Sequence, residues 1–125
     1  PVFEYICSAE YARNYDPDHF DQLKSFYRYI SKNYRANIYT KDIAAHMNLT
    51  EVGFYRYIKR HTGKTFTEIL NEVRISEACK LLVDTELSIA EICFKCGFNN
   101  ISYFNRKFKI ALGSTPKSFR HKYQD

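Results

Sequence analysis

The stretch from Ser88 to Thr115 reads SIAEICFKCGFNNISYFNRKFKIALGST, and it contains the start and stop signals of two successive helices. Ser88 and Glu91 form the Ser-x-x-Glu pattern of a capping box, in which each side chain satisfies an unpaired backbone amide of the first helical turn. The short helix that begins there is expected to stop at Gly97, because glycine tolerates the positive φ of a sharp turn. The first half of the stretch therefore predicts a short helix and a tight turn.

A second helix is predicted directly after this turn. Either Asn99 or Asn100 can supply the side-chain oxygen that caps its first amides. Phe104 and Phe108 are four residues apart and share one face of the helix, which we expect to be buried. Gly113 follows as a left-handed C-terminal cap. A short helix, a tight turn and a second helix form the pattern of a helix-turn-helix.

An earlier part of the chain repeats this pattern. Residues 54–65 match residues 104–115 at an offset of 50, through Phe, Arg, an apolar residue, Lys, Gly and Thr in the same order. Residues 42–44 match residues 91–93 at an offset of 49, and we place the one-residue difference in the turn, where insertions are tolerated best. One such pattern is weak evidence, but two copies in one chain indicate a duplicated unit.

The residues expected in the two turns suit a sharp reversal between crossed helices. Asn48 and Gly97 belong to the residue types that adopt positive φ most readily. Ala44 and Cys93 are small, and they stand where one helix must approach the other closely. The two turns are therefore expected to have the same geometry.

Capping signals mark the starts of the other helices. Each combines an oxygen-bearing side chain with an apolar run at helical spacing. These signals are Asp16-Pro17, Thr40, Thr50, Thr65–Glu68 and Thr115-Pro116. The helix after Asp16 is expected to run to about residue 34, and the helix after Thr65 to about Asp84. Because no segment alternates with a period of two, we predict an all-α fold of about seven helices and no sheet.

This helix order divides the chain into four parts. We expect a linker or the tail of an upstream element at residues 1–15, a first helix-turn-helix subdomain at 16–65, a linker helix at 66–84 and a second subdomain at 85–125. Since the chain begins at Pro1 and not at Met, we also expect it to be a piece of a longer protein.

Charge is distributed unevenly along the chain. The 125 residues carry a formal net charge of +5. Residues 1–23 contain one basic and five acidic side chains, whereas residues 24–125 contain 18 basic and nine acidic side chains. The basic body suggests a polyanionic partner such as nucleic acid, with an inert basic surface as the alternative.

The hydrophobic content of 45% is enough for a core. No window is apolar enough for a membrane span.

Other chemistries find less support. Cys93 and Cys96 form a CxxC pair, but a zinc site needs a second pair and only Cys79 offers a third ligand. We interpret the pair as apolar packing residues, with metal or redox sensing as the alternative.

The histidines form no triad, so we predict no catalytic residue, metal or cofactor. The aromatic content of 17% leaves a protein-interaction module as another class, and a DNA-repair enzyme fragment is a third. The cysteine usage fits a reducing cytoplasm.

The duplicated pattern resembles the AraC/XylS family of bacterial transcriptional regulators over about residues 18–123. The most specific part is residues 87–98, followed by Ser102-Tyr103-Phe104, Arg106, Phe108-Lys109, Gly113, Thr115-Pro116 and Arg120. The resemblance implies two helix-turn-helix subdomains, joined by the helix at 66–84, whose recognition helices enter successive major-groove segments of double-stranded DNA. It also implies an effector or dimerisation domain elsewhere in the full-length protein, with RNA polymerase as a further candidate partner.

Helical spacing separates the residues expected to reach base edges from the buried ones. The outward residues of the first recognition helix are Glu51, Val52, Tyr55 and Arg56, and those of the second are Asn100, Ile101, Ser102, Asn105 and Arg106. An arginine can pair with two acceptors of guanine, an asparagine can read adenine, and an apolar side chain can contact the methyl group of thymine. For each arginine, a phosphate contact or a solvated surface position is the alternative. For Tyr55, surface packing is the alternative.

Helix N-termini and nearby basic side chains are expected to contact phosphates. The candidates are Thr40, Lys41, Thr50, Arg74, Asn99, Lys107 and Lys117. Gly53, inside the first recognition helix, departs from the family pattern and is expected to cost about 0.5–1 kcal/mol relative to alanine. It also removes a side chain near the face that meets DNA. We therefore expect the second recognition helix to make more of the base-specific contacts than the first.

Overall fold

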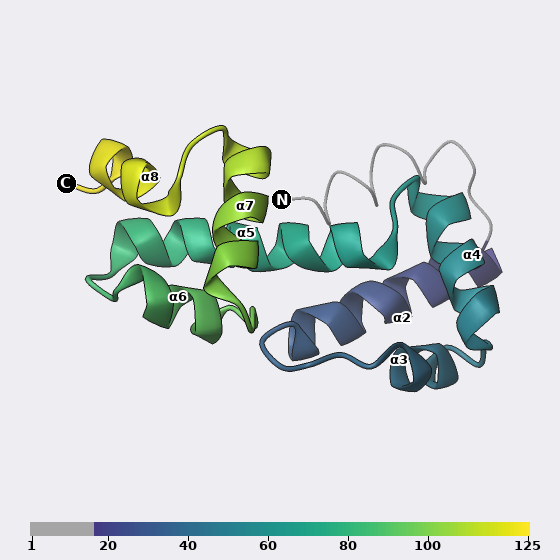
Figure 1. The fold of residues 1–125 in the computed structure, drawn as a ribbon. Coiled ribbons are helices and arrows are strands. Elements are labelled where there is room, and N and C mark those ends of the chain that lie inside the picture. The colour runs from purple at the N-terminus through teal and green to yellow at the C-terminus, as the bar shows by residue number, and fades with distance from the viewer. Residues whose placement is uncertain (1–16) are drawn as a thin grey trace. The chain divides into compact units, whose positions relative to one another are not determined.

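The computed structural model describes residues 17–125, with side chains from residue 21 onward. Within this range the fold is all-α and contains no strand, as predicted (Figure 1). The segment expected at residues 1–15 and the predicted cap at Asp16 lie outside the described residues. The helices are α2 (Pro17–Asn33), α3 (Thr40–His46), α4 (Glu51–Thr62), α5 (Phe66–Asp84), α6 (Ile89–Lys95), α7 (Ile101–Leu112) and α8 (Pro116–Tyr123).

The chain forms two compact units. Their boundary lies between Leu70 and Asn71, inside α5, so this helix contributes its first residues to one unit and its later turns to the other.

The first unit is built around three phenylalanines from three helices. Phe26 of α2, Phe54 of α4 and Phe66 of α5 have ring centroids 5.4 to 6.2 Å apart, and Phe26 and Phe54 are fully buried. Ile43 of α3 and Ile58 of α4 are also buried. The apolar positions at helical spacing thus define one core, and burying each large side chain stabilises the unit by roughly 1.5–3 kcal/mol.

The second unit has a matching core. Phe104 and Phe108 of α7 are fully buried, with Phe98 packed against Phe104 at 5.1 Å between ring centroids. Cys93 and Cys96 belong to the same buried cluster, which confirms their predicted apolar positions. Figure 1 shows α6, α7 and α8 gathered around the later turns of α5.

Helix starts follow the predicted caps at five places. The side-chain oxygens of Thr50, Ser88, Asn100 and Thr115 each accept a hydrogen bond from the backbone amide three residues later. Thr65 accepts in the same way from the Glu68 amide at 3.1 Å, and the box of Ser88 and Glu91 is complete in both directions. Each cap contributes about 1 kcal/mol to the stability of its helix.

The predicted cap at Thr40 is wrong. The N-cap position of α3 is Tyr39, whose side chain makes no capping hydrogen bond, and Thr40 is the first helical residue. The Thr40 hydroxyl oxygen instead accepts a hydrogen bond of 2.9 Å from the Tyr55 hydroxyl. A contact between helices distant in sequence therefore replaces the local capping contact.

The two turns are closed by corresponding backbone hydrogen bonds. The Leu49 amide donates to Ala44 O at 2.9 Å in the first turn, and the Phe98 amide donates to Cys93 O at 3.1 Å in the second. Asn48 and Gly97, the predicted positive-φ residues, have φ of 58° and 103°. This is the hydrogen bonding of a left-handed helix C-cap, in which the backbone reverses sharply.

The one-residue difference between the copies lies directly after these turns. Leu49 is followed at once by the N-cap Thr50, whereas Asn99 separates Phe98 from the N-cap Asn100. The extra residue is therefore Asn99, in the connection between α6 and α7, where the core is not disturbed.

Candidate nucleic-acid interface

The outward face of α4 carries the first set of predicted reading residues. Glu51, Val52, Tyr55 and Arg56 are all exposed, while Phe54 between them is fully buried. Val52 is 60% exposed, so its side chain is accessible to a partner on this face. The helix thus separates a core stripe from an outward face, as its spacing predicts.

Tyr55 is held in place on this face. Its hydroxyl donates to Thr40 Oγ1, and its ring packs edge-on against Phe54 at 5.8 Å between centroids. Tyr55 is still 49% exposed, so part of its side chain remains available to a partner. Tyr55 therefore combines surface packing, the alternative to DNA contact at this position, with a partly accessible side chain.

Gly53 lies under the cap of the same helix. Its amide donates to Thr50 Oγ1 at 3.0 Å, and a Cβ atom at position 53 would approach that oxygen to 3.1 Å. This spacing is tighter than ordinary van der Waals contact. The glycine thus removes a reading side chain but leaves the cap oxygen undisturbed.

The outward face of α7 carries the second set. Asn100, Ile101, Ser102, Asn105 and Arg106 are all exposed, and Phe104 and Phe108 point into the core. Asn100 Oδ1 is occupied by the Tyr103 amide at 2.8 Å, because Asn100 is the N-cap. This leaves the Asn100 amide group to donate to an acceptor outside the protein.

Tyr103 organises the basic residues of this second face. The guanidinium of Arg106 and the ammonium of Lys107 each lie 5.5 Å from the centre of its ring. Its hydroxyl accepts a hydrogen bond of 2.8 Å from Nδ2 of Asn71, a buried residue of α5. Cations over an aromatic ring are attracted by its quadrupole, so the ring orients both side chains. Tyr103 was missed from the sequence, although its positions three and four residues before the two cations are the available signal.

Arg74 of α5 is one of three half-buried residues among the predicted phosphate contacts, with Thr40 and Lys107. Its guanidinium lies 5.6 Å from the centre of the Phe98 ring, and burial lowers the pKa of this group. Arg74 thus packs on an aromatic ring of the core of the second unit.

The remaining phosphate candidates are spread over both units. Lys41, Thr50, Asn99 and Lys117 are exposed, and Thr40 and Lys107 are half-buried. Thr50 uses its oxygen as a cap but keeps its hydroxyl proton to donate. In each unit the candidates that lie at a helix N-terminus are next to amides that favour anions.

Two other features, a metal-ligand group and a membrane-spanning helix, are absent from the described part of the chain. Among the side chains that the structure describes, from residue 21 onward, no group of three or more His, Cys, Asp or Glu is able to hold a metal ion. None of the described helices is long and apolar enough to cross a membrane.

The chain is similar to known regulators in sequence. Residues 43–122 match the family model described as a helix-turn-helix domain. The HTH-type transcriptional activator RhaS of Pectobacterium carotovorum is 32% identical over 93 residues, which are 74% of this chain and 33% of that protein. The chain spans about a third of the length of the curated relatives it matches first.

Solved structures share the fold. A probable AraC family transcriptional regulator from Rhodopseudomonas palustris has a TM-score of 0.78 at 21% identity, covering 84% of this chain and 99% of that one. The DNA-binding domain of AdpA, solved in complex with a target DNA, has a TM-score of 0.74 at 22% identity, covering 82% of this chain and 91% of that one. With the family match over residues 43–122 and the two matching turns, the chain belongs to the AraC/XylS family of helix-turn-helix transcriptional regulators and contains its DNA-binding domain.

Proposed function

We propose that this chain binds double-stranded DNA in a sequence-specific manner, with α4 and α7 entering successive segments of the major groove. The observation that carries the proposal is the pair of turns with corresponding backbone hydrogen bonds, each followed by a helix with a buried phenylalanine and an exposed outward face. A helix presented in this way fits the major groove, where each base pair has a distinct donor and acceptor pattern. The structure of the AdpA domain with DNA is consistent with this use of the fold.

The second unit is the stronger reader in this proposal. Its outward face combines two amide side chains, a hydroxyl and Arg106, all of which form hydrogen bonds with base edges. The Tyr103 ring beside Arg106 reduces the freedom that this arginine loses on binding. The first unit offers Val52 and Arg56 for reading, since the hydroxyl of Tyr55 is engaged with Thr40.

Selection of binding sites from random duplex DNA tests the proposal. We expect a recovered motif with two elements about one helical turn apart. Binding to that motif should weaken steeply as salt rises, because phosphate contacts release counterions. Equal affinity for all duplexes would contradict sequence-specific binding.

Arg106→Ala tests base reading by the second unit. We expect a loss of about 1–3 kcal/mol on the selected site and a relaxed preference at one position. Lys80→Ala, which removes an exposed charge from α5 of the same unit, is the matched control and should leave the motif unchanged. If Arg106→Ala lowers affinity equally on all sequences, Arg106 contacts a phosphate instead.

The wider role of the protein follows from its family. We propose that the full-length protein acts on transcription in the cytoplasm, and that it carries an effector or dimerisation domain outside this chain. RNA polymerase is the candidate protein partner. Expression profiling of a deletion strain, compared with the selected motif, tests this role, and it fails if no gene beside the motif changes its expression.

A further inference from the structure

The Tyr103 ring of α7 is fixed from a neighbouring helix. Asn71, on α5, is a buried residue and the first residue of the second unit, and its Nδ2 donates to the Tyr103 hydroxyl at 2.8 Å. The Phe98 ring lies against the Tyr103 ring, with 6.1 Å between the two centroids. A tyrosine on the surface of a helix has more than one accessible rotamer, and these two contacts select one of them.

Two cations lie on this fixed ring. The guanidinium of Arg106 and the ammonium of Lys107 are three and four residues further along the same helix, and each is 5.5 Å from the ring centre. Side chains at this spacing are neighbours on a helix surface, and a cation at this distance is attracted by the ring quadrupole. Arg106 is otherwise exposed. The orientation of its guanidinium therefore depends on Asn71, through the ring that lies between them.

The first unit lacks this arrangement at the corresponding positions. At the offset of 50, Arg106 corresponds to Arg56, but Tyr103 corresponds to Gly53, which has no side chain. Among the residues that the structure describes, none forms a ring contact, hydrogen bond or ion pair with Arg56. The duplication thus contains one reading arginine with a ring and one without.

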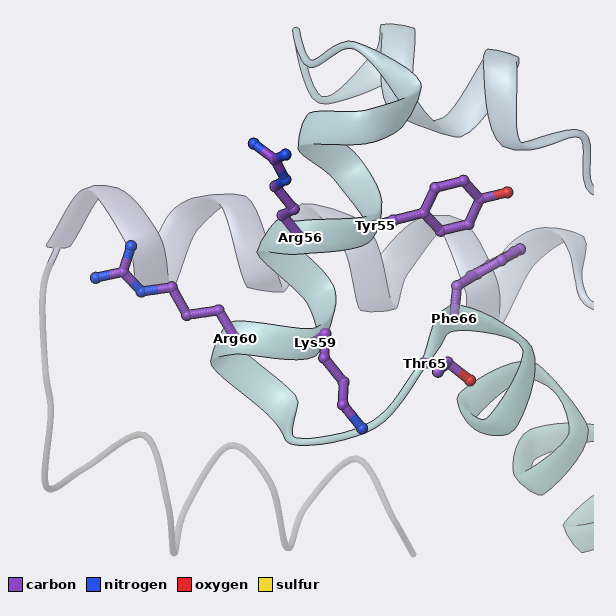
Figure 2. A pocket seen from close by; sticks show the side chains of 6 residues that line it. All are labelled: Tyr55, Arg56, Lys59, Arg60, Thr65 and Phe66. Atoms are coloured by element: carbon purple, nitrogen blue, oxygen red, sulfur yellow. The ribbon is translucent and has the colours of Figure 1, made fainter.

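The surroundings of Arg56 show why no other ring takes the place of Tyr103. Arg56 lines an open pocket of about 640 Å³ between α4 and the start of α5. Figure 2 shows Arg56 and Arg60 projecting from α4 on the side away from Tyr55 and Phe66, the two aromatic residues of the pocket. These rings therefore do not hold Arg56, and its side chain keeps the freedom of an exposed arginine.

We propose that Asn71 and Tyr103 are positioning residues that set the base preference of Arg106. Asn71 holds the ring, and the ring holds the guanidinium in the orientation in which it meets a base edge. The inference rests on the proposed function, and it assigns part of the specificity of α7 to a buried residue of α5. An arginine that is already held loses less freedom on binding, and this advantage counts most where both of its donors meet a guanine. Loss of the ring should therefore lower binding to the preferred base more than binding to other bases.

The readout is the base preference at one position of the selected site, measured as the ratio of affinities for the selected base and its replacement. Arg106→Ala identifies this position. Tyr103→Leu should lower the ratio there roughly twofold to fivefold, the range expected for an exposed cation–π contact, and leave the other positions unchanged. Asn71→Leu should lower the same ratio, although Asn71 is buried on another helix. Because both changes act through Arg106, neither should alter the ratio further in an Arg106→Ala background.

Tyr103→Phe separates the ring from the hydrogen bond. Phenylalanine keeps a ring for the cations but offers no acceptor to Asn71, so the ratio should fall less than in Tyr103→Leu. Adding Asn71→Leu to Tyr103→Phe should not change the ratio further, and this double variant also avoids an unpaired buried amide. Phe119→Leu, which removes a ring packed on Phe108 at 5.5 Å, is the control for stability in the same unit. It should leave the ratio unchanged, because partial unfolding lowers the affinity for all sequences equally.

An equal loss of affinity on all sequences in Tyr103→Leu or Asn71→Leu would give both residues a purely structural role and overturn the inference. A sharper preference in Tyr103→Leu would also overturn it, since the ring would then compete with DNA for Arg106. If Arg106→Ala changes no base preference, Arg106 contacts a phosphate, and the inference fails while a motif selected by the wild-type protein still supports the proposed function. Failure of the wild-type protein to select any motif would instead count against the proposed function itself.

Discussion

The Tyr55 hydroxyl donates a hydrogen bond of 2.9 Å to Thr40 Oγ1, and this bond joins the two helices of the first helix-turn-helix. Thr40 begins α3 and Tyr55 lies on α4, so the bond links α4 to the first turn of α3. The second copy has Asn105 at the position of Tyr55 and therefore lacks this phenol.

Tyr55→Phe should weaken the first unit slightly. The substitution removes an exposed hydrogen bond but keeps the ring, so we expect a loss of about 0.5–1 kcal/mol in the free energy of unfolding. Tyr39→Phe is the control, because Tyr39 is 64% exposed and its side chain makes no capping bond. Chemical denaturation of both variants measures the difference, and equal midpoints would show that the bond contributes nothing.

Gly53→Ala should stabilise α4 by less than helix propensity alone predicts. Alanine gains about 0.5–1 kcal/mol over glycine inside a helix, but its Cβ would stand 3.1 Å from the Thr50 cap oxygen. In a Thr50→Ala background this obstacle is gone, so the full gain should appear there. Unfolding of the four proteins in this cycle measures the coupling, and strictly additive effects would show that the cap accommodates the methyl group freely.

The bond between Asn71 and Tyr103 should show strong coupling. Tyr103→Phe leaves the buried Asn71 amide without its acceptor, which should cost about 1–3 kcal/mol. Asn71→Leu combined with Tyr103→Phe removes both partners, so the double variant should lose less than the sum of the single losses. A double-mutant cycle by urea unfolding tests this, and an interaction energy of zero would contradict it.

Arg120 and Gln124 should stabilise the end of α5. Arg120 donates to Leu82 O at 3.0 Å and to Thr85 O at 3.1 Å, and Gln124 Nε2 donates to Thr85 O at 2.7 Å. Removing a charged donor from such carbonyls should cost about 1.5–3 kcal/mol, so we expect this loss for Arg120→Ala. His121→Ala, at the exposed neighbouring position, should have little effect. Hydrogen exchange at the last turn of α5 should rise in the first variant alone, and equal exchange in both would refute the capping role.

The Cys93 thiol should react slowly in the folded protein. It is fully buried, and burial raises its pKa, so it stays protonated at a pH where exposed thiols begin to ionise. Alkylation followed by mass spectrometry should modify Cys93 more slowly than the half-buried Cys79, and modification of Cys93 should be fast only in urea. The pKa of the Cys93 thiol is higher in the folded state than in the unfolded state. The contribution of this thiol to the free energy of unfolding is therefore fully present below the ordinary thiol pKa and is lost as pH rises through the folded-state pKa.

A redox or metal role for the CxxC pair predicts the opposite behaviour. Rapid modification of Cys93 at neutral pH would support a reactive thiol. Loss of helicity or of DNA binding on treatment with a chelator would support a metal site, whereas the burial of Cys93 and Cys96 in the apolar core predicts no change.

Local chemistry in the sequence determined where most helices begin and end. Thr50, Ser88 and Asn100 cap helices because their side-chain oxygens reach amides only three residues away. Asn48 and Gly97 adopt positive φ because of their own backbone preferences. The repeat at offsets of 49 and 50 likewise predicted two identical turns, since it compares residues directly. These features depend only on neighbours along the chain, so the order of residues is enough to predict them.

Contacts between distant residues were decided only by the tertiary structure. The sequence predicted that the Thr40 hydroxyl caps a helix, and it could not show that this hydroxyl bonds to Tyr55, 15 residues away. The link from Asn71 to Tyr103 spans 32 residues, and the pocket beside Arg60 depends on how α4 meets the start of α5. Capping and turn preferences act within one helical turn, whereas these contacts depend on how whole helices pack. The sequence alone could therefore predict the two helix-turn-helix units and their outward faces, but not which side chains on those faces are already engaged.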